Sequence, residues 1–415
     1  MNRRMFSQLM AFGAGLISSP AGWAGQANAA ESDDAAPAAN PDAPWKSPPV
    51  TVEDFIPLAE AKLPKATFDY ITTGSEEQVT LKDNVEAFRR IQVVPPLLHG
   101  VQSADLSTTV LGQKIDLPVL IAPVAALRMY HPQGALAVAR AAEKAGTIFC
   151  PSTSAYNSVE EIAAASSGPK WFQMYVPRDR NIARKLVNRA EKSGYKALVV
   201  TVDLGERKDA DLRNRFRPPQ DMLVKHLRDV GHTQVTGRET YDELLAFNSN
   251  AWDISLSWDF FKWLREVTEL PIIVKGVLSQ PAAEEAFKLV DGIIVSNHGG
   301  RRLDGMPASI DVLADVAATV RTLEEREGRK ITLLLDSGVR RGGDVLRALA
   351  LGADAVLIGR PHAWALAAAG EAGVTRVLNI LHDELTTAMV AAGCATVDDI
   401  DYRVFKGNTD SGAVR

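Results

Sequence analysis

The feature that most restricts the fold is an alternation of short apolar segments with segments of helical period, which begins at residue 117. Eight apolar, β-branched segments lie at 117–122, 147–151, 171–176, 197–202, 271–275, 292–296, 331–335 and 355–358. Such segments are typical of parallel strands buried on both faces of a sheet. Segments of helical period lie between them, for example at 135–144, 181–192, 281–289 and 344–351. We predict an α/β protein whose eight strand–helix units close into a (β/α)8 TIM barrel, and an open doubly wound sheet is the alternative.

Two segments lie outside this regular alternation. Residues 51–116 have helical patterns at 52–62 and 64–71 and then an extended character. We predict an N-terminal helical extension that caps the base or flanks the mouth of the barrel. The connection 204–270, after the fourth strand, is much longer than the others, and long loops of this kind usually cover or form binding sites.

The N-terminal residues have the pattern of a targeting signal. Within residues 1–30, Arg3 and Arg4 precede a mildly apolar run and a small-residue tract, as in a twin-arginine-type signal peptide. We expect export to the periplasm and no membrane span; a disordered cytoplasmic tail is the alternative. Residues 31–50 are rich in alanine, proline and aspartate and predict a disordered linker, so that the barrel domain occupies 51–415.

Composition excludes several classes of protein. The chain has 415 residues, 46% of them hydrophobic and 23% charged, which is ordinary for a globular protein. Its formal net charge of −5 gives no overall basic field, so we expect no nucleic-acid partner. With two cysteines and no metal-ligand spacing of histidines or acids, we predict neither a disulfide scaffold nor a metal site.

Polar residues follow the ends of several predicted strands, where the catalytic groups of such barrels lie. They include Gln173, Tyr175, Thr201, Asp203, Lys275, Ser296, His298, Arg301, Arg302, Asp336, Arg340 and Arg360, and they are accompanied by glycines such as Gly338 and Gly359. His298 is the candidate general base, because imidazole titrates near neutral pH and Asp203 could orient it. Arg301 could bind a carboxylate through two hydrogen bonds. Lys275 ends an apolar strand and therefore needs an anionic partner within the mouth of the barrel.

The last two strand ends predict a phosphate site. Glycines near Arg340 and Arg360 allow backbone amides to approach an anion, and each following helix adds the partial positive charge of its N-terminus. The two arginines could donate charge-assisted hydrogen bonds to phosphate oxygens. We therefore predict a ligand that carries phosphate.

Five motifs resemble those of a known family, the FMN-dependent α-hydroxy acid oxidases and dehydrogenases, which include glycolate oxidase, lactate oxidase and mandelate dehydrogenase. They are SNHGGRRLD at 296–304, LPIIVKG at 270–276, DSGVRRGGDVLRALALGADAVLIGRP at 336–361, WFQMYV at 171–176 and KLPKATFDYITTGSEEQ at 62–78. The resemblance extends over about 52–400. It implies oxidation of an L-2-hydroxy acid to the 2-keto acid by bound FMN.

The resemblance also assigns roles on the substrate side. His298 would take the proton of the substrate hydroxyl, and Asp203 would stabilise the imidazolium that forms. Arg301 and Tyr70 would hold the substrate carboxylate, and Tyr175 would hydrogen-bond the hydroxyl or keto oxygen. The second carboxylate-binding arginine of the family has no clear counterpart, and either Arg207 or Lys208 could take its place. Ser154 or a neighbour stands where glycolate oxidase has a tryptophan, which leaves the size of the substrate pocket open.

On the cofactor side, the resemblance places Lys275 beside the pyrimidine edge of the flavin. Contacts to FMN are implied for Pro123, Val124, Ala125, Ser152, Gln173, Thr201, Lys275, Ser296, Asp336, Gly338, Arg340, Gly359 and Arg360. Ala125 stands where oxidases of the family have alanine and several dehydrogenases have glycine, which favours dioxygen as electron acceptor. A periplasmic location would favour a quinone or a cytochrome. The resemblance suggests a homotetramer, and an FMN-dependent isomerase and a non-catalytic periplasmic flavin-binding protein are the alternative functions.

Overall fold

The computed structural model describes residue 45, residues 47–203 and residues 216–406. The predicted signal peptide lies outside the described residues, as do most of the predicted linker, Arg207 and Lys208. The last residues of that linker pack on the folded domain: the ring of Trp45 meets Phe55 edge-on at 6.1 Å, and Pro49 is buried.

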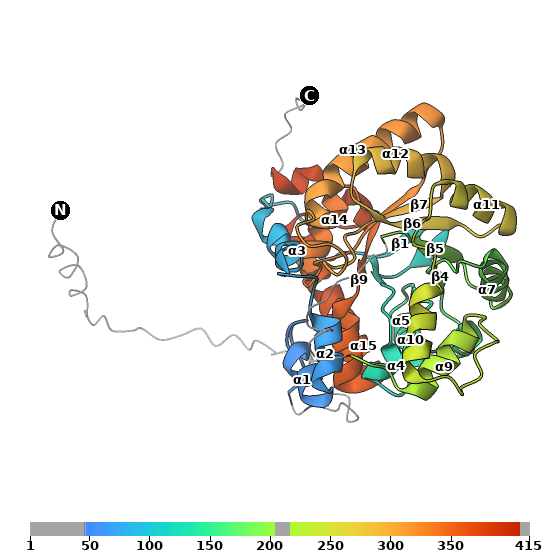
Figure 1. Cartoon of the computed structure of the whole chain (residues 1–415). Helices are drawn as coiled ribbons and strands as arrows, with labels where there is room; N and C mark the ends of the chain where they lie inside the picture. The colour runs from blue at the N-terminus through green and yellow to red at the C-terminus, as the bar shows by residue number, and fades with distance from the viewer. Residues whose placement is uncertain (1–44, 46, 204–215, 407–415) are drawn as a thin grey trace, which may run out of the picture. The chain divides into compact units, whose positions relative to one another are not determined.

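Seven parallel strands form a curled sheet in the order β3-β9-β8-β7-β6-β5-β4 (Figure 1). Their bounds are β3 (Val119–Ile121), β4 (Trp171–Met174), β5 (Ala197–Thr201), β6 (Ile272–Val277), β7 (Gly292–Val295), β8 (Thr332–Leu335) and β9 (Ala355–Ile358). Almost every residue in them is buried, as the apolar sequence pattern predicts.

The segment around Phe149 closes the sheet into a barrel. Phe149 bridges in parallel to Ile121 of β3 on one side and to Lys170, next to β4, on the other. The backbone N–H of Cys150 donates to Ile121, and that of Gln173 donates to Pro151, at 2.9 and 3.0 Å. The predicted second strand therefore lies in its expected place, although it is joined by isolated bridges. The (β/α)8 barrel is confirmed, and the open sheet is excluded.

Helices surround the strands. Those that follow barrel strands are α5 (Ala135–Lys144), α6 (Val159–Ala164), α7 (Arg180–Lys192), α11 (Asp259–Val267), α12 (Gln280–Leu289), α13 (Ser309–Glu327), α14 (Gly342–Ala350) and α15 (Arg360–Ala391), and a short α4 (Leu127–Tyr130) precedes α5. Local signals fix their starts, such as the Ser158 capping box of α6 and the N-cap Ser279 followed by a proline in α12. The four helices predicted from periodicity are confirmed to within two residues at either end.

A hairpin covers the N-terminal end of the barrel. It consists of β1 (Thr108–Val110) and β2 (Gln113–Ile115), which pair antiparallel. Its buried Val110 and Ile115 pack in one cluster with Trp171, Ala197 and Ala355, the first residues of three barrel strands. This part of the N-terminal extension caps the base, as predicted.

The rest of the extension is helical and contains one helix that the sequence analysis missed. Helices α1 (Phe55–Lys62) and α2 (Lys65–Thr72) were expected, but α3 (Val79–Arg90) lies where we predicted extended chain. Its apolar side is narrow, and much of its buried side is polar, including Asn84. Asn84 exchanges two side-chain hydrogen bonds of 2.9 and 2.7 Å with Asn297, in the loop after β7. The extension thus supports the loop that carries His298.

The long connection after β5 is largely helical. It contains α9 (Gln220–Asp229), α10 (Tyr241–Asn250) and α11, while 204–215 lie outside the described residues. Helices α9 and α10 have a small core of their own, formed by Leu223, Val224, Leu227, Val235 and Leu244. The expectation of a long loop was therefore only partly right, because these helices are an added layer beside the barrel mouth.

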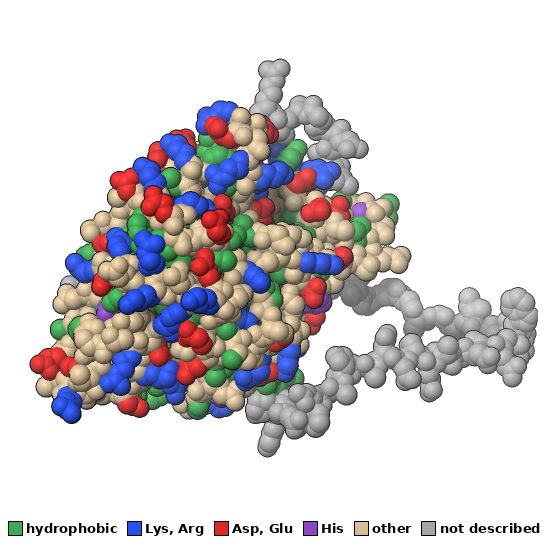
Figure 2. Space-filling view, turned by 90° about the vertical axis from the view of Figure 1, so that its right-hand side faces the viewer, with side chains coloured by type: hydrophobic (Ala, Val, Ile, Leu, Met, Phe, Trp, Pro, Cys, Tyr) green, Lys and Arg blue, Asp and Glu red, His purple; other side chains and the backbone are tan. Residues whose placement is uncertain are grey.

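Two 3-10 helices, η1 (Val397–Asp399) and η2 (Tyr402–Phe405), end the described chain. None of the described helices combines the length and the apolar character needed to cross a bilayer. On the face shown in Figure 2, basic and acidic side chains are interspersed, so neither sign dominates that side of the domain.

Candidate active site

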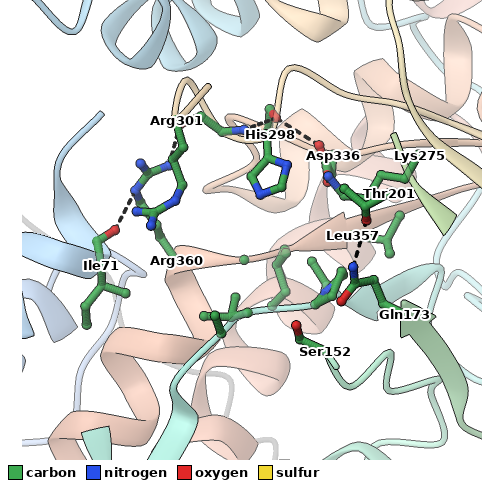
Figure 3. A pocket seen from close by; sticks show the side chains of 18 of the residues that line it. Ile71, Ser152, Gln173, Thr201, Lys275, His298, Arg301, Asp336, Leu357 and Arg360 are labelled. Carbon is green, nitrogen blue, oxygen red and sulfur yellow. Dashed lines mark hydrogen bonds and ion pairs between the residues drawn. The ribbon is translucent and has the colours of Figure 1, made fainter. Parts of the chain in front are cut away.

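A pocket opens at the carboxyl ends of the barrel strands, and it brings together most of the predicted site residues (Figure 3). The predicted residues that line it are Tyr70, Pro123, Val124, Ala125, Ser152, Gln173, Tyr175, Thr201, Lys275, His298, Arg301, Asp336, Gly338, Arg340, Gly359 and Arg360. Asp203 and Ser296 lie directly behind this wall and hydrogen-bond to its side chains. The pocket also contains Arg302, for which no role was predicted from the sequence.

His298 is held at the mouth by its backbone and by Asp203. It follows β7 with a positive φ of 58°, and its backbone N–H donates to the Ser296 hydroxyl at 3.0 Å. Its Nδ1 lies 2.8 Å from Oδ1 of Asp203. The absence of a side chain at Gly276 leaves room for Asp203, because a Cβ at position 276 would lie only 2.9 Å from the Cβ of Asp203. The predicted pairing of base and carboxylate is therefore present.

The surroundings of His298 keep its ring neutral. Burial and the adjacent positive charge of Arg302 lower the pKa of His298 to about 4, although Asp203 acts in the opposite direction. Burial alone would raise the pKa of Asp203, but its contact with His298 and the charge of Lys275 hold that pKa below its ordinary value. At neutral pH the carboxylate accepts the Nδ1 proton, which leaves the lone pair on Nε2.

Lys275 has the anionic partner that its burial requires. Its Nζ lies 3.0 Å from Oδ2 of Asp336 and donates to the Ser296 hydroxyl at 2.8 Å. Burial would lower the pKa of Lys275, but the carboxylates of Asp336 and Asp203 raise it above its ordinary value. A buried, protonated ammonium group is therefore fixed in the pocket wall.

Two arginine–tyrosine pairs flank His298. The guanidinium of Arg301 lies 4.9 Å from the ring centre of Tyr70 and donates to the Tyr70 carbonyl at 2.6 Å. The Tyr70 ring is stacked on Phe216 at 4.0 Å, which connects this pair to the segment that precedes α9. Arg302 donates to the hydroxyl of Tyr175 at 2.8 Å. One sequence signal could have indicated a role for Arg302: it follows Arg301 and lies only four residues after His298, on the same loop.

Arg340 and Arg360 are buried in the pocket wall, and Arg360 lies beside Arg301 (Figure 3). Arg360 donates to three carbonyls, those of Ile71, Gly299 and Thr73, at 2.8 to 3.0 Å. Arg340 donates to its neighbour's carbonyl and lies 5.2 Å from the ring of Trp364. Burial lowers the pKa of Arg340 to about 10, and it lowers that of Arg360 as well.

These two guanidinium groups fit a bound anion. Neither makes an ion pair with any carboxylate in the described part of the chain. Buried cations without such a partner are unfavourable unless an anion compensates them. Both lie next to helix N-termini, those of α14 and α15, where backbone N–H groups favour phosphate. The donor set therefore fits the phosphate of a flavin mononucleotide.

A wall of small and polar residues connects the two ends. Pro123, Val124 and Ala125 follow β3, and the Gln173 amide donates to the Thr201 hydroxyl at 3.0 Å. The Ala125 carbonyl accepts a 3.0 Å hydrogen bond from Tyr130. Ser154 is not part of the pocket lining; its carbonyl accepts from the Ala126 N–H at 2.7 Å. No group of three or more histidine, cysteine or acidic side chains among the described residues is arranged to hold a metal ion.

Known proteins resemble the chain over most of its length. A family model, FMN-dependent dehydrogenase, matches residues 59–406. Human 2-hydroxyacid oxidase 1 (Homo sapiens) is 44% identical over 369 residues, covering 86% of this chain and 97% of that protein. Glycolate oxidase 3 of Oryza sativa subsp. japonica is 46% identical over 358 residues, covering 84% and 94%.

Solved structures give the same result. A mandelate oxidase crystal structure is 37% identical with a TM-score of 0.75, covering 85% of this chain and 96% of that one. A lactate oxidase from Pediococcus acidilactici is 35% identical with a TM-score of 0.74, covering 86% and 94%. The chain belongs to the FMN-dependent dehydrogenase family, and its cofactor is FMN.

Proposed function

We propose that this enzyme oxidises an L-2-hydroxy acid to the corresponding 2-keto acid. The observation that carries the proposal is the neutral His298, whose Nδ1 is bonded to Asp203 and whose Nε2 faces a pocket flanked by arginine–tyrosine pairs. Such a pocket combines a base for a hydroxyl proton with cations for the adjacent carboxylate. The names of the relatives, which are 2-hydroxyacid, glycolate, lactate and mandelate oxidases, support the same chemistry.

In this mechanism Arg301 and Tyr70 hold the substrate carboxylate, and the hydroxyl points to Nε2 of His298. His298 takes the hydroxyl proton, and Asp203 stabilises the imidazolium through its contact with Nδ1. Tyr175, whose hydroxyl lies 3.5 Å from Nε2, hydrogen-bonds the substrate oxygen as it becomes a carbonyl. FMN, when bound, supplies the two-electron acceptor for the hydrogen on the substrate's α-carbon.

The residues that would hold FMN lie along the rest of the pocket. Arg340 and Arg360 would bind its phosphate, and the wall formed by Pro123, Val124 and Ala125 would contact the ring system. Lys275 would stabilise negative charge on the reduced ring, because Asp336 and Ser296 fix its ammonium group in place.

Anaerobic mixing with a panel of glycolate, L-lactate, L-mandelate and longer L-2-hydroxy acids tests this function. We expect the yellow flavin absorbance to bleach with at least one acid and an equal amount of 2-keto acid to form. An FMN-dependent isomerase would convert its substrate without a net loss of that absorbance, and a non-catalytic flavin-binding protein would do neither. These are the two alternative functions, and each would overturn the proposal.

We propose dioxygen as the electron acceptor, on the basis of Ala125 and of the relatives named oxidases. Stopped-flow mixing of the reduced enzyme with air-saturated buffer should reoxidise the flavin and produce hydrogen peroxide. If reoxidation takes many minutes with oxygen but is rapid with a quinone or a cytochrome, the enzyme is a dehydrogenase.

We further propose export to the periplasm by the twin-arginine-type signal, and assembly as a homotetramer. Arg3 and Arg4 ahead of the apolar run motivate the first proposal, and the family resemblance motivates the second. Mass spectrometry of protein from the native host should find an N-terminus near Ala30, and sedimentation should give four chains per particle. An intact Met1 in the cytoplasm would contradict export.

A further inference from the structure

Arg302 lies against the base of the proposed reaction. Its Nη2 is 2.8 Å from the Tyr175 hydroxyl and 3.2 Å from Nε2 of His298, and its guanidinium carbon lies 5.6 Å from the centre of the Tyr175 ring. The residue lies four positions after His298 and next to Arg301, on the loop after β7. This side chain therefore reaches the atoms that the proposed function assigns to the substrate oxygen.

The contact with Nε2 has a chemical consequence. Because Nδ1 of the neutral ring donates to Asp203, Nε2 is the acceptor nitrogen. An arginine has only donors, so the 3.2 Å contact directs an N–H of Arg302 at the lone pair of His298. That same lone pair must take the proton from the substrate hydroxyl. While Arg302 remains in this position, the base is occupied.

We propose that Arg302 binds the substrate carboxylate and leaves Nε2 of His298 when it does so, which frees the base. This inference rests on the proposed function of the site. Arg301 keeps its predicted role on the Tyr70 side, and Arg302 supplies a second carboxylate contact on the Tyr175 side.

Charge and distance support this exchange of partners. A hydrogen bond from guanidinium to carboxylate is roughly twice as strong as one to a neutral acceptor, and it can be bidentate. In a 2-hydroxy acid the carboxylate is attached to the carbon that carries the hydroxyl. A group that binds the carboxylate must therefore lie beside the base, as Arg302 does.

The exchange also gives a basis for specificity. A neutral alcohol offers Arg302 no anion, so the arginine stays on Nε2 and the base remains occupied. A hydroxy acid provides the anion that draws the arginine away. The carboxylate thereby contributes both to binding and to the availability of the base, which makes Arg302 a specificity-determining residue.

The test compares an acid with its own amide in three variants, Arg302→Gln, Arg302→Lys and the control Arg326→Gln. Arg326 lies at the end of α13 and is exposed, with Glu327 as its ion-pair partner. The ligands are the acid of the L-2-hydroxy acid panel that reduces the flavin fastest, or the one that binds most tightly if none reduces it, and the primary amide of the same acid. Dissociation constants are measured anaerobically from changes in flavin absorbance and from the saturation of flavin reduction.

We expect Arg302→Gln to raise the dissociation constant of the acid about ten- to hundredfold, the range for a hydrogen bond between charged groups. The constant for the amide should change less than about twofold, because the amide has no charge to lose. Arg302→Lys should fall between Arg302→Gln and the wild type, and Arg326→Gln should match the wild type. An equal loss for acid and amide, or no loss for either, would overturn the proposal.

The pH profile provides a second readout, which a purely structural role would not move. Loss of the positive charge beside His298 should raise the pKa of that ring in the free enzyme. At low substrate concentration, the fall of the reduction rate toward acid pH should therefore begin at higher pH in Arg302→Gln than in the wild type. The same pH dependence in Arg302→Gln and the wild type would contradict the contact between Arg302 and His298.

The wild-type measurements separate this inference from the proposed function. If the wild type binds the acids without flavin reduction, the proposed function fails, but the comparison of affinities still decides the role of Arg302. If the wild type binds no acid of the panel, both proposals are overturned.

Discussion

The two ends of the pocket are built from different parts of the chain. At the phosphate end, Arg340 lies in the loop after β8, beside the N-terminus of α14. Arg360 begins α15 and extends toward the substrate end, where it lies beside Arg301. At the substrate end, Tyr70 comes from the N-terminal extension and Phe216 from the insertion after β5, and both are only partly buried. The loops of the barrel thus carry the cofactor site and the base, whereas segments added to the barrel complete the substrate site. A change at Arg340 should therefore leave the base chemistry intact, and a change at His298 should leave FMN binding intact.

The largest effect should follow removal of the base. In His298→Ala the hydroxyl proton has no acceptor, so flavin reduction should slow by about 10²- to 10⁴-fold, the usual range for a general base. Anaerobic stopped-flow absorbance measures this rate. FMN content should equal that of the wild type, because His298 lies at the substrate end. Loss of flavin in this variant would show that the two ends are coupled.

A change at the phosphate end should weaken FMN binding and leave the base in place. Arg340→Ala should weaken FMN binding about ten- to hundredfold, since one charge-assisted hydrogen bond contributes roughly 1.5–3 kcal/mol. We choose Arg340 because Arg360 also holds the carbonyls of Ile71, Thr73 and Gly299, so that its loss would disturb several loops. Equilibrium dialysis of the apoprotein with FMN gives the constant. Arg326→Ala is the matched control, and equal FMN affinity in both variants would refute the phosphate site.

A smaller change is expected at the substrate end from Phe216→Ala. This variant removes the ring stacked on Tyr70 at 4.0 Å. An aromatic pair contributes about 0.5–1.5 kcal/mol beyond the buried area, so KM should rise about two- to tenfold while FMN affinity stays unchanged. Steady-state kinetics measures the first quantity and dialysis the second. An unchanged KM would mean that Tyr70 needs no support from the insertion.

The pH dependence should be the smallest effect near neutrality. His298 acts as a base only when neutral, and its pKa is lowered to about 4 by burial and by Arg302. The rate of flavin reduction at substrate concentrations far below saturation reports the free enzyme, so it should be level from pH 8 to about 6 and fall by half only near pH 4. A midpoint near the ordinary histidine value of about 6.5 would mean that the charge of Arg302 does not act on the base.

The same division explains what the sequence could predict. The sequence predicted the barrel strands from their apolar pattern. It also predicted the site residues Arg340, Arg360, His298 and Asp203, because the carboxyl ends of all the parallel strands lie at one face of a barrel. Helix α3 was missed because its buried side carries polar residues such as Asn84, whose partner Asn297 lies far away in the sequence. The contacts of Arg302 with Tyr175 and His298 are likewise long-range or depend on a tight turn, so they are visible only in three dimensions.

The most direct test of the account is the flavin reduction rate at saturating FMN, measured side by side in Arg340→Ala and His298→Ala. Excess FMN compensates for weak cofactor binding but cannot replace a missing base. We predict that the rate in Arg340→Ala recovers to within about threefold of the wild type, while the rate in His298→Ala remains at least about a hundredfold slower. A deficit in Arg340→Ala that saturating FMN does not correct, or recovery of His298→Ala, would contradict the separation of cofactor binding from base catalysis.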